Sequence, residues 1–198
     1  MALRNVCCSA PVAVERSPKP KRATMEITTV MGVPAHPLMV HVPVVLVPLA
    51  TLGIFAMFWP SWRTRIGWIV VLFAGAALFF TQLAIGSGEA LEESVKETRL
   101  LEAHTETAEG ARLWVFLFFI AVLGVMVLVT LLKRRAAAAG TKAPSNPPMV
   151  LAAVAIAALL GVAASAVVYD VGHSGAKATW GDVKIKSGGA EGGGEAGE

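Results

Sequence analysis

The chain has 198 residues, 55% of them apolar, and its 17 basic and 14 acidic side chains give a net charge of +3. Four long stretches carry no charge at all: residues 37–61, 66–88, 113–132 and 143–169. Soluble domains need charged faces on their surface helices, whereas apolar runs of about 18 or more residues are typical of membrane spans. The composition therefore excludes an ordinary cytosolic enzyme. No clustered basic face of the kind that binds nucleic acid is visible.

The first segment, residues 1–30, is predicted to be a disordered tail. Its first 24 residues combine five basic side chains with three prolines, a composition that disfavours a packed core. The only apolar run is shorter than the roughly 7 to 15 residues of a secretory signal core. Cys7 and Cys8 are adjacent and fit no metal or redox spacing. Met25 and Met31 are alternative start sites.

The next segment, residues 31–183, is predicted to be a membrane domain. At 1.5 Å per residue, each uncharged stretch can cross a hydrocarbon layer of about 30 Å as a helix that satisfies its own backbone polar groups. The predicted fold is therefore an all-α, polytopic membrane four-helix bundle. The remaining residues, 184–198, are Gly-rich and are predicted to be a disordered tail. The four spans are expected at about residues 37–60, 66–87, 112–133 and 148–170.

Two spans have further features. Pro43 and Pro48 in the first should kink the helix or leave carbonyl groups free, whereas Pro37 suits a first turn. Ahead of the third span, residues 89–112 contain good helix formers and no proline. We therefore expect the third helix to begin well above the membrane, as an acidic helical extension.

The short loops predict the orientation, because cytoplasmic loops are enriched in Lys and Arg. The loops on one side hold six basic residues, whereas the opposite connection, residues 89–112, has three basic residues and seven acidic ones. The six-residue side is expected to be cytoplasmic, with both termini outside. A start at Met25 would remove the one conflict, a translocated basic tail. The six basic residues are Arg63, Arg65, Lys133, Arg134, Arg135 and Lys142.

The chain has four histidines, and this topology places all of them on the external side. Ionisable residues near membrane spans are costly and often functional. His36 and His41 are about 140° apart on an ideal helix, so they should not share one face. The alternative is that His36 caps its helix, His104 is solvated and His173 lies in a turn.

Imidazole side chains suit Zn, Cu, Ni or Fe, and two of them from facing helices can bind haem axially. The predicted cofactor site is therefore His36, His41, His104 and His173, holding haem b or, alternatively, a transition metal. The nearby carboxylates Glu89, Glu92 and Glu106 are candidate partners of the ligands. Hydrolase and nucleotide-binding motifs are absent from the sequence, so an enzymatic role extends at most to a redox component. No carboxylate lies within the four uncharged stretches, which disfavours a proton-coupled carrier.

Four short motifs carry a resemblance to a known family. They are GVPAHPLMVHVP at residues 32–43, GSGE at 86–89, His104, and GHSG at 172–175. With these, the chain resembles the bacterial four-helix membrane family called domain of unknown function 2231, over residues 31–183. The resemblance implies a b-type-cytochrome-like architecture in a bacterial cell membrane, and it strengthens the haem or metal interpretation of the four histidines. Without a CxxCH motif, any haem would be held noncovalently.

Three functional hypotheses follow. The first is a membrane protein whose external histidine cluster binds haem or a metal for electron transfer or redox sensing, with a redox partner protein. The second is a structural or assembly subunit whose histidines only pack. The third is a pathway for a small solute or ion, which an apolar interior would disfavour.

Overall fold

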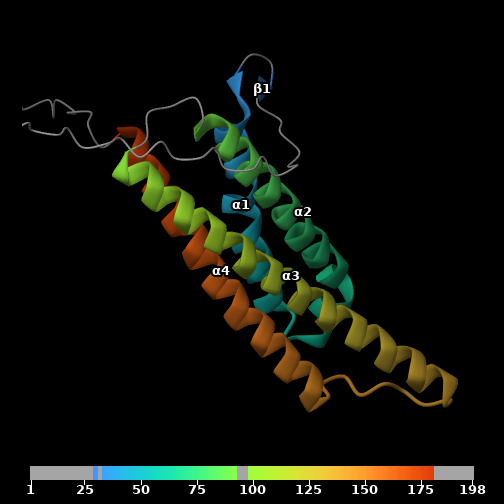
Figure 1. Ribbon diagram of the computed structural model, residues 1–198. Helices are drawn as coiled ribbons and strands as arrows, with labels where there is room; N and C mark the ends of the chain where they lie inside the picture. The colour runs from blue at the N-terminus through green and yellow to red at the C-terminus, as the bar shows by residue number, and fades with distance from the viewer. Residues whose placement is uncertain (1–28, 31–32, 93–97, 181–198) are drawn as a thin grey trace, which may run out of the picture.

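Four long helices make up most of the computed structural model, which describes residues 29–30, 33–92 and 98–180. They are α1 (Ala35–Ala56), α2 (Pro60–Glu92), α3 (Arg99–Ala138) and α4 (Pro148–Trp180), and they run alternately up and down (Figure 1). Each is long and apolar enough to cross a membrane. This confirms the predicted all-α, polytopic membrane bundle.

A short hairpin precedes the bundle. The strands β1 (Thr29–Val30) and β2 (Val33–Pro34) pair antiparallel directly before α1. Residues 29–30, predicted as the end of the N-terminal tail, form β1. The rest of the predicted tails, residues 1–28 and 184–198, lies outside the described residues.

Local signals set the helix ends. Pro60 and Pro148 are the first residues of α2 and α4, where proline's fixed φ suits a helix and its missing N–H costs nothing. At the start of α3, the Thr98 hydroxyl accepts a hydrogen bond from the Leu101 N–H at 3.2 Å. Gly140 ends α3 with a φ of +65°, a left-handed conformation that favours glycine. Because α3 begins at Arg99, the predicted acidic extension above the third span is confirmed.

The first helix contains two internal prolines, Pro43 and Pro48. Each removes one backbone hydrogen bond from the helix. The helix nevertheless runs without a break from Ala35 to Ala56, with Pro43 buried and Pro48 exposed. The prolines therefore do not divide α1 into two segments.

The core of the bundle is apolar, and so is most of its outer surface. Phe118, Ile54 and Met57 are fully buried between the helices. On the outside, Leu52, Leu72 and Leu159 are 66%, 65% and 72% exposed. Such extensive exposed apolar surface is unfavourable in water and marks contact with a membrane. The lipid bilayer is therefore the surrounding solvent of these helices.

A glycine allows close contact between helices in the middle of the bundle. A Cβ atom added to Gly161 of α4 would lie 2.7 Å from Thr51 Oγ1 and 2.8 Å from Phe118 Cε2. Small residues permit such approach in membrane bundles, where dispersion contacts provide much of the stability. Gly161 therefore lets α4 pack closely against Thr51 of α1 and Phe118 of α3.

Hydroxyl groups in the middle of the bundle donate to backbone carbonyls of their own helices. Thr51 donates to the Val47 carbonyl and Thr81 to the Ala77 carbonyl, each at 2.8 Å and one turn back along its own helix. Ser165 donates in the same way to Gly161. Thr51 Oγ1 and Ser165 Oγ also lie 3.3 Å apart, between α1 and α4. Because each of these hydroxyls already donates within its own helix, none has a donor left for a solute, which disfavours the solute-pathway hypothesis.

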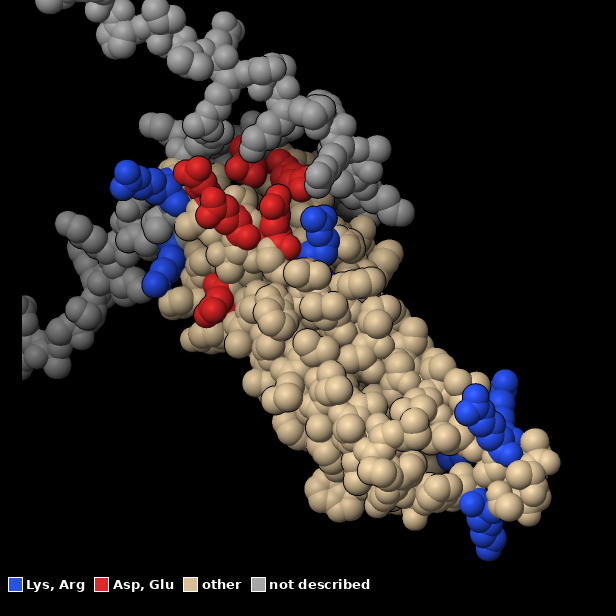
Figure 2. All heavy atoms as spheres, turned by 60° about the horizontal axis from the view of Figure 1, so that its bottom comes forward, with Lys and Arg blue, Asp and Glu red and all other residues tan. Residues whose placement is uncertain are grey.

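Charge separates the two ends of the bundle. Figure 2 shows acidic side chains gathered at one end, with a few basic ones among them, and only basic side chains at the other, across an uncharged band. The acidic end carries the start of α3 and the ends of α2 and α4. The basic end carries the turn between α1 and α2 and the connection between α3 and α4.

Arg63 links the loops at the basic end. It is 3% exposed, and its Nε donates to the Met57 carbonyl at 2.9 Å. One terminal nitrogen donates to the Ser145 carbonyl at 3.2 Å, and the other to the Phe58 carbonyl and Asn146 Oδ1, both at 3.4 Å. A single guanidinium therefore joins the end of α1 to the α3–α4 connection.

Candidate histidine site

The four histidines lie at the acidic end of the bundle, two on α1 and one each on α3 and α4. His36 and His104 are partly buried, whereas His41 and His173 are exposed. Two of the four predicted ligands therefore face the interior of the bundle.

His36 is anchored to α2. Its Nδ1 lies 2.8 Å from the Ala84 carbonyl oxygen, which also accepts a hydrogen bond from the Ser87 hydroxyl at 3.0 Å. Because a carbonyl only accepts, the Nδ1–H must donate, and the unprotonated nitrogen is then Nε2. The ring rests on Gly88, where an added Cβ would come within 3.0 Å of it.

His104 is anchored to α4 in the same way. Its Nδ1 lies 3.0 Å from Ser174 Oγ, and the Ser174 hydroxyl itself donates to the Val171 carbonyl at 3.0 Å. With that proton already used, Ser174 accepts and His104 Nδ1–H donates, which again leaves Nε2 unprotonated. The ring lies against Gly175, where an added Cβ would be 2.9 Å from Cε1.

The two anchored rings meet each other. Their centroids are 6.3 Å apart and their planes are inclined by 86°. Two imidazoles bound to one metal at about 2 Å per bond have centroids about 6 Å apart, so the observed spacing suits a shared metal centre. Metal-binding histidines usually donate their second ring nitrogen to a protein oxygen, as both do here. His36 and His104 thus have the hydrogen bonding of a ligand pair.

The other two histidines make contacts within their own helices. His41 folds back on its own helix, where its Nδ1–H donates to the Pro37 carbonyl. His173 stacks on Tyr169 of α4, with centroids 6.0 Å apart and planes inclined by 6°. The expectation that His36 and His41 do not share a face of α1 is confirmed.

The alternative roles considered for the histidines need correction. His173 does not lie in a turn, because α4 continues as a helix to Trp180. His104 is partly buried against Gly175 and is not a solvated surface residue. His36 bonds to a carbonyl of α2 and does not cap α1.

Carboxylates contribute little to the described site. Glu89 and Glu106 are exposed, and Glu92 is partly buried. Among residues 29–30, 33–92 and 98–180, no three His, Cys, Asp or Glu side chains are grouped so that they could hold a metal ion. The donor set that the described residues offer is therefore the nitrogen pair of His36 and His104.

Sequence reasoning missed the residues that hold the two rings. The oxygens of Ala84 and Ser174 orient them, and Gly88 and Gly175 leave room for them. The GSG and GHSG motifs contain three of these four residues: Gly88, Ser174 and Gly175. The sequence therefore held a sign of them, namely two short motifs in which glycines flank a serine. Its meaning depended on which ring each motif faces.

One protein family matches most of the chain. The match covers residues 32–186, more than half of the sequence, and the family is described as a predicted membrane protein, DUF2231. The chain belongs to this family. The DUF2231 match includes all four helices and both anchored histidines. None of the curated proteins and none of the solved structures compared with the chain matches it.

Two glycines of α4 provide a matched test of the contact between the His104 ring and Gly175. An added Cβ meets nothing within 4 Å at Gly172 but comes 2.9 Å from His104 at Gly175. Either Gly→Ala change should favour the helix by about 1 kcal/mol. We expect only Gly175→Ala to displace the ring and offset that gain.

The measurement is the pair of imidazole ¹⁵N chemical shifts of His104 in detergent-purified protein, which report the tautomer. Gly172→Ala should preserve the wild-type shifts, whereas Gly175→Ala should average them as the bond to Ser174 is lost. Unchanged His104 shifts in Gly175→Ala would show that the ring does not pack against Gly175.

Proposed function

We propose that this integral membrane protein binds haem b through His36 and His104 and serves in electron transfer or redox sensing. The observation that supports the proposal is the anchored pair itself. The two imidazoles, one from α1 and one from α3, have centroids 6.3 Å apart, and each donates a hydrogen bond from Nδ1, which leaves its Nε2 unprotonated. Helix bundles commonly build cofactor sites from side chains on facing helices.

The number of ligands favours haem over a bare metal ion. A structural or catalytic zinc site takes three or four protein ligands, whereas haem needs at most two because the porphyrin fills the other positions. The described residues offer two grouped nitrogens and no third grouped ligand. A transition metal ion completed by solvent is the alternative occupant of the same pair.

The protein's own residues would do three things at such a site. Ala84 and Ser174 hold each imidazole in the tautomer that presents Nε2, which raises its basicity as a ligand. Gly88 and Gly175 let the rings lie directly against α2 and α4. When bound, haem supplies reversible one-electron transfer, at a potential set by its axial ligands and its burial.

We further propose that the basic end faces the cytoplasm of a bacterium and the histidine end the outside of the cell membrane. Support comes from six Lys and Arg residues at one end, without a described acidic residue beside them. A redox partner would then dock at the acidic end.

The test is an absorption spectrum with metal analysis of the full chain purified in detergent, before and after addition of haemin. We expect a Soret band that shifts on reduction, with one iron per protein. Protein that shows no Soret band after haemin addition, and no stoichiometric metal, would overturn the proposal.

A structural or assembly role is the second candidate. One observation favours it: the two histidines connect all four helices, since His36 of α1 bonds to α2, His104 of α3 bonds to α4, and their rings meet. In that role the pair stabilises the end of the bundle and holds no cofactor.

A further inference from the structure

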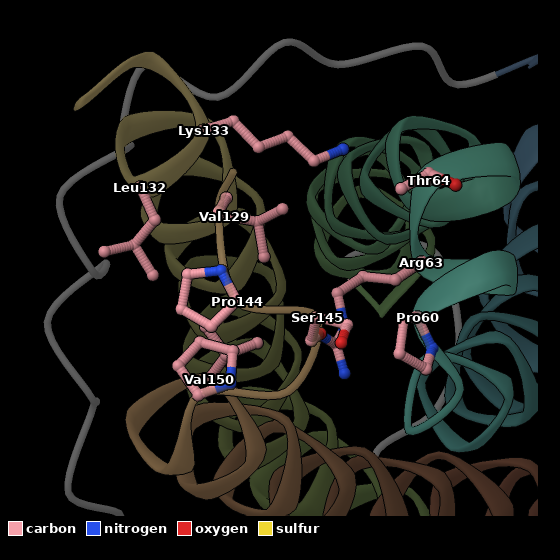
Figure 3. A pocket seen from close by; sticks show the side chains of 11 residues that line it. Pro60, Arg63, Thr64, Val129, Leu132, Lys133, Pro144, Ser145 and Val150 are labelled. Atoms are coloured by element: carbon pink, nitrogen blue, oxygen red, sulfur yellow. The ribbon is translucent and has the colours of Figure 1, made fainter. Parts of the chain in front are cut away.

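A pocket of about 190 Å³ lies at the basic end, between α2, α3 and the connection that leads to α4. Val129 and Leu132 form part of its apolar wall. Arg63 and Lys133 line it with positive charge, and none of its lining residues is acidic. In Figure 3 the Lys133 side chain extends from α3 toward α2, and Arg63 reaches from α2 toward Ser145.

The charge of Arg63 meets no carboxylate among the described residues. Its four hydrogen bonds go to three backbone carbonyls and the amide oxygen of Asn146, which are neutral. Lys133 adds a second, exposed cation. A buried or half-enclosed charge of this kind favours an anion nearby. Four further basic residues surround this end: Arg65, Arg134, Arg135 and Lys142.

The pocket's volume and its position at the membrane interface indicate what kind of anion it binds. Its volume is below the roughly 300–1,000 Å³ of sites that enclose a whole small molecule, so it suits one part of a larger one. Trp59 and Trp62, 63% and 51% exposed, mark this end as the membrane interface.

We propose that this pocket binds the headgroup of an anionic phospholipid. The phosphate lies between Lys133 and Arg63, and the acyl chains extend into the surrounding hydrocarbon. Basic pockets between transmembrane helices are suited to anionic headgroups, because the phosphate gains two cations while the chains stay in hydrocarbon. The site is at the opposite end from the histidine pair and does not depend on it.

The test measures lipid binding to the full chain in detergent by native mass spectrometry. The probes are phosphatidylglycerol, phosphatidylcholine and inorganic phosphate. We expect phosphatidylglycerol to bind more tightly than phosphatidylcholine, and Lys133→Gln to weaken its binding about fivefold, the effect of one basic side chain at an anionic surface. The control Arg134→Gln removes the same charge from an exposed neighbour that does not line the pocket, and it should have a much smaller effect.

Three outcomes would overturn the proposal. The first is equal binding of the two lipids, and the second is equal weakening by Lys133→Gln and Arg134→Gln, which would indicate only diffuse attraction. The third is displacement of phosphatidylglycerol by inorganic phosphate at equal concentration, which would assign the pocket to the free anion. Because Arg63 also holds two loops together, Lys133 is the residue that decides the test.

Discussion

Replacing either His36 or His104 with alanine is expected to reduce the affinity for haem at least about 100-fold, because changing even a hydrogen-bond partner of a ligand typically costs about 10–100-fold. Each change removes one of the two imidazole rings whose centroids lie 6.3 Å apart at the end of the bundle. The measurement is a haemin titration of detergent-purified protein, followed at the Soret band.

The exposed histidines provide the controls. His41 and His173 belong to the four-histidine site expected from sequence, but in the described part of the chain His41 bonds to Pro37 and His173 stacks on Tyr169, each within its own helix. We therefore expect His41→Ala and His173→Ala to bind haem like the wild type. Equal losses in all four variants would favour the larger four-histidine site. Lower thermal stability in His36→Ala and His104→Ala, without any haem binding to the wild type, would favour the structural role.

The second large effect concerns stability, and we expect it for Arg63→Met. Methionine fills a similar volume but leaves the carbonyls of Met57, Phe58 and Ser145 without their guanidinium donor. Unpaired buried acceptors cost about 1–3 kcal/mol each. This cost is largest for Met57, which is fully buried, and smallest for Ser145, which is exposed and open to water. The free energy of unfolding should therefore fall by about 3 kcal/mol.

Unfolding of detergent-purified protein by heat or denaturant measures this effect. Arg65→Met is the matched control, because Arg65 is an exposed residue of the same helix. Its loss should change the stability by less than about 0.5 kcal/mol. If the two variants unfold alike, the hydrogen bonds of Arg63 do not hold the α1–α2 turn to the α3–α4 connection.

The spans were predictable because a membrane helix needs a long run of residues without charge, and each run is visible in the sequence. The acidic extension of α3 was predictable as well, since residues 99–112 carry good helix formers without proline. The path of α1 was harder to predict from the sequence. Pro43 and Pro48 each remove a local backbone hydrogen bond, yet the helix is continuous through both.

Arg63 illustrates a residue whose role was hidden in the sequence. Its charge counted only toward the orientation of the loops, together with five other basic residues of the same end. In the folded protein it is buried and bonds to Ser145 and Asn146, which are 82 and 83 residues away along the chain. Contacts over such separations depend on how the α1–α2 pair packs against the α3–α4 pair, and a local sequence pattern does not predict that packing.

For the histidines, the sequence alone determined the end of the bundle at which each one lies, because alternating spans place the start of α1, the start of α3 and the end of α4 together. It also determined that His36 and His41 point in different directions, since helical periodicity sets angles within one helix. Only the tertiary structure decided that His36 meets His104 while His41 and His173 stay outside. The reason is that membrane helices are apolar on nearly all faces, so the rotation of each about its axis depends on close packing with its neighbours.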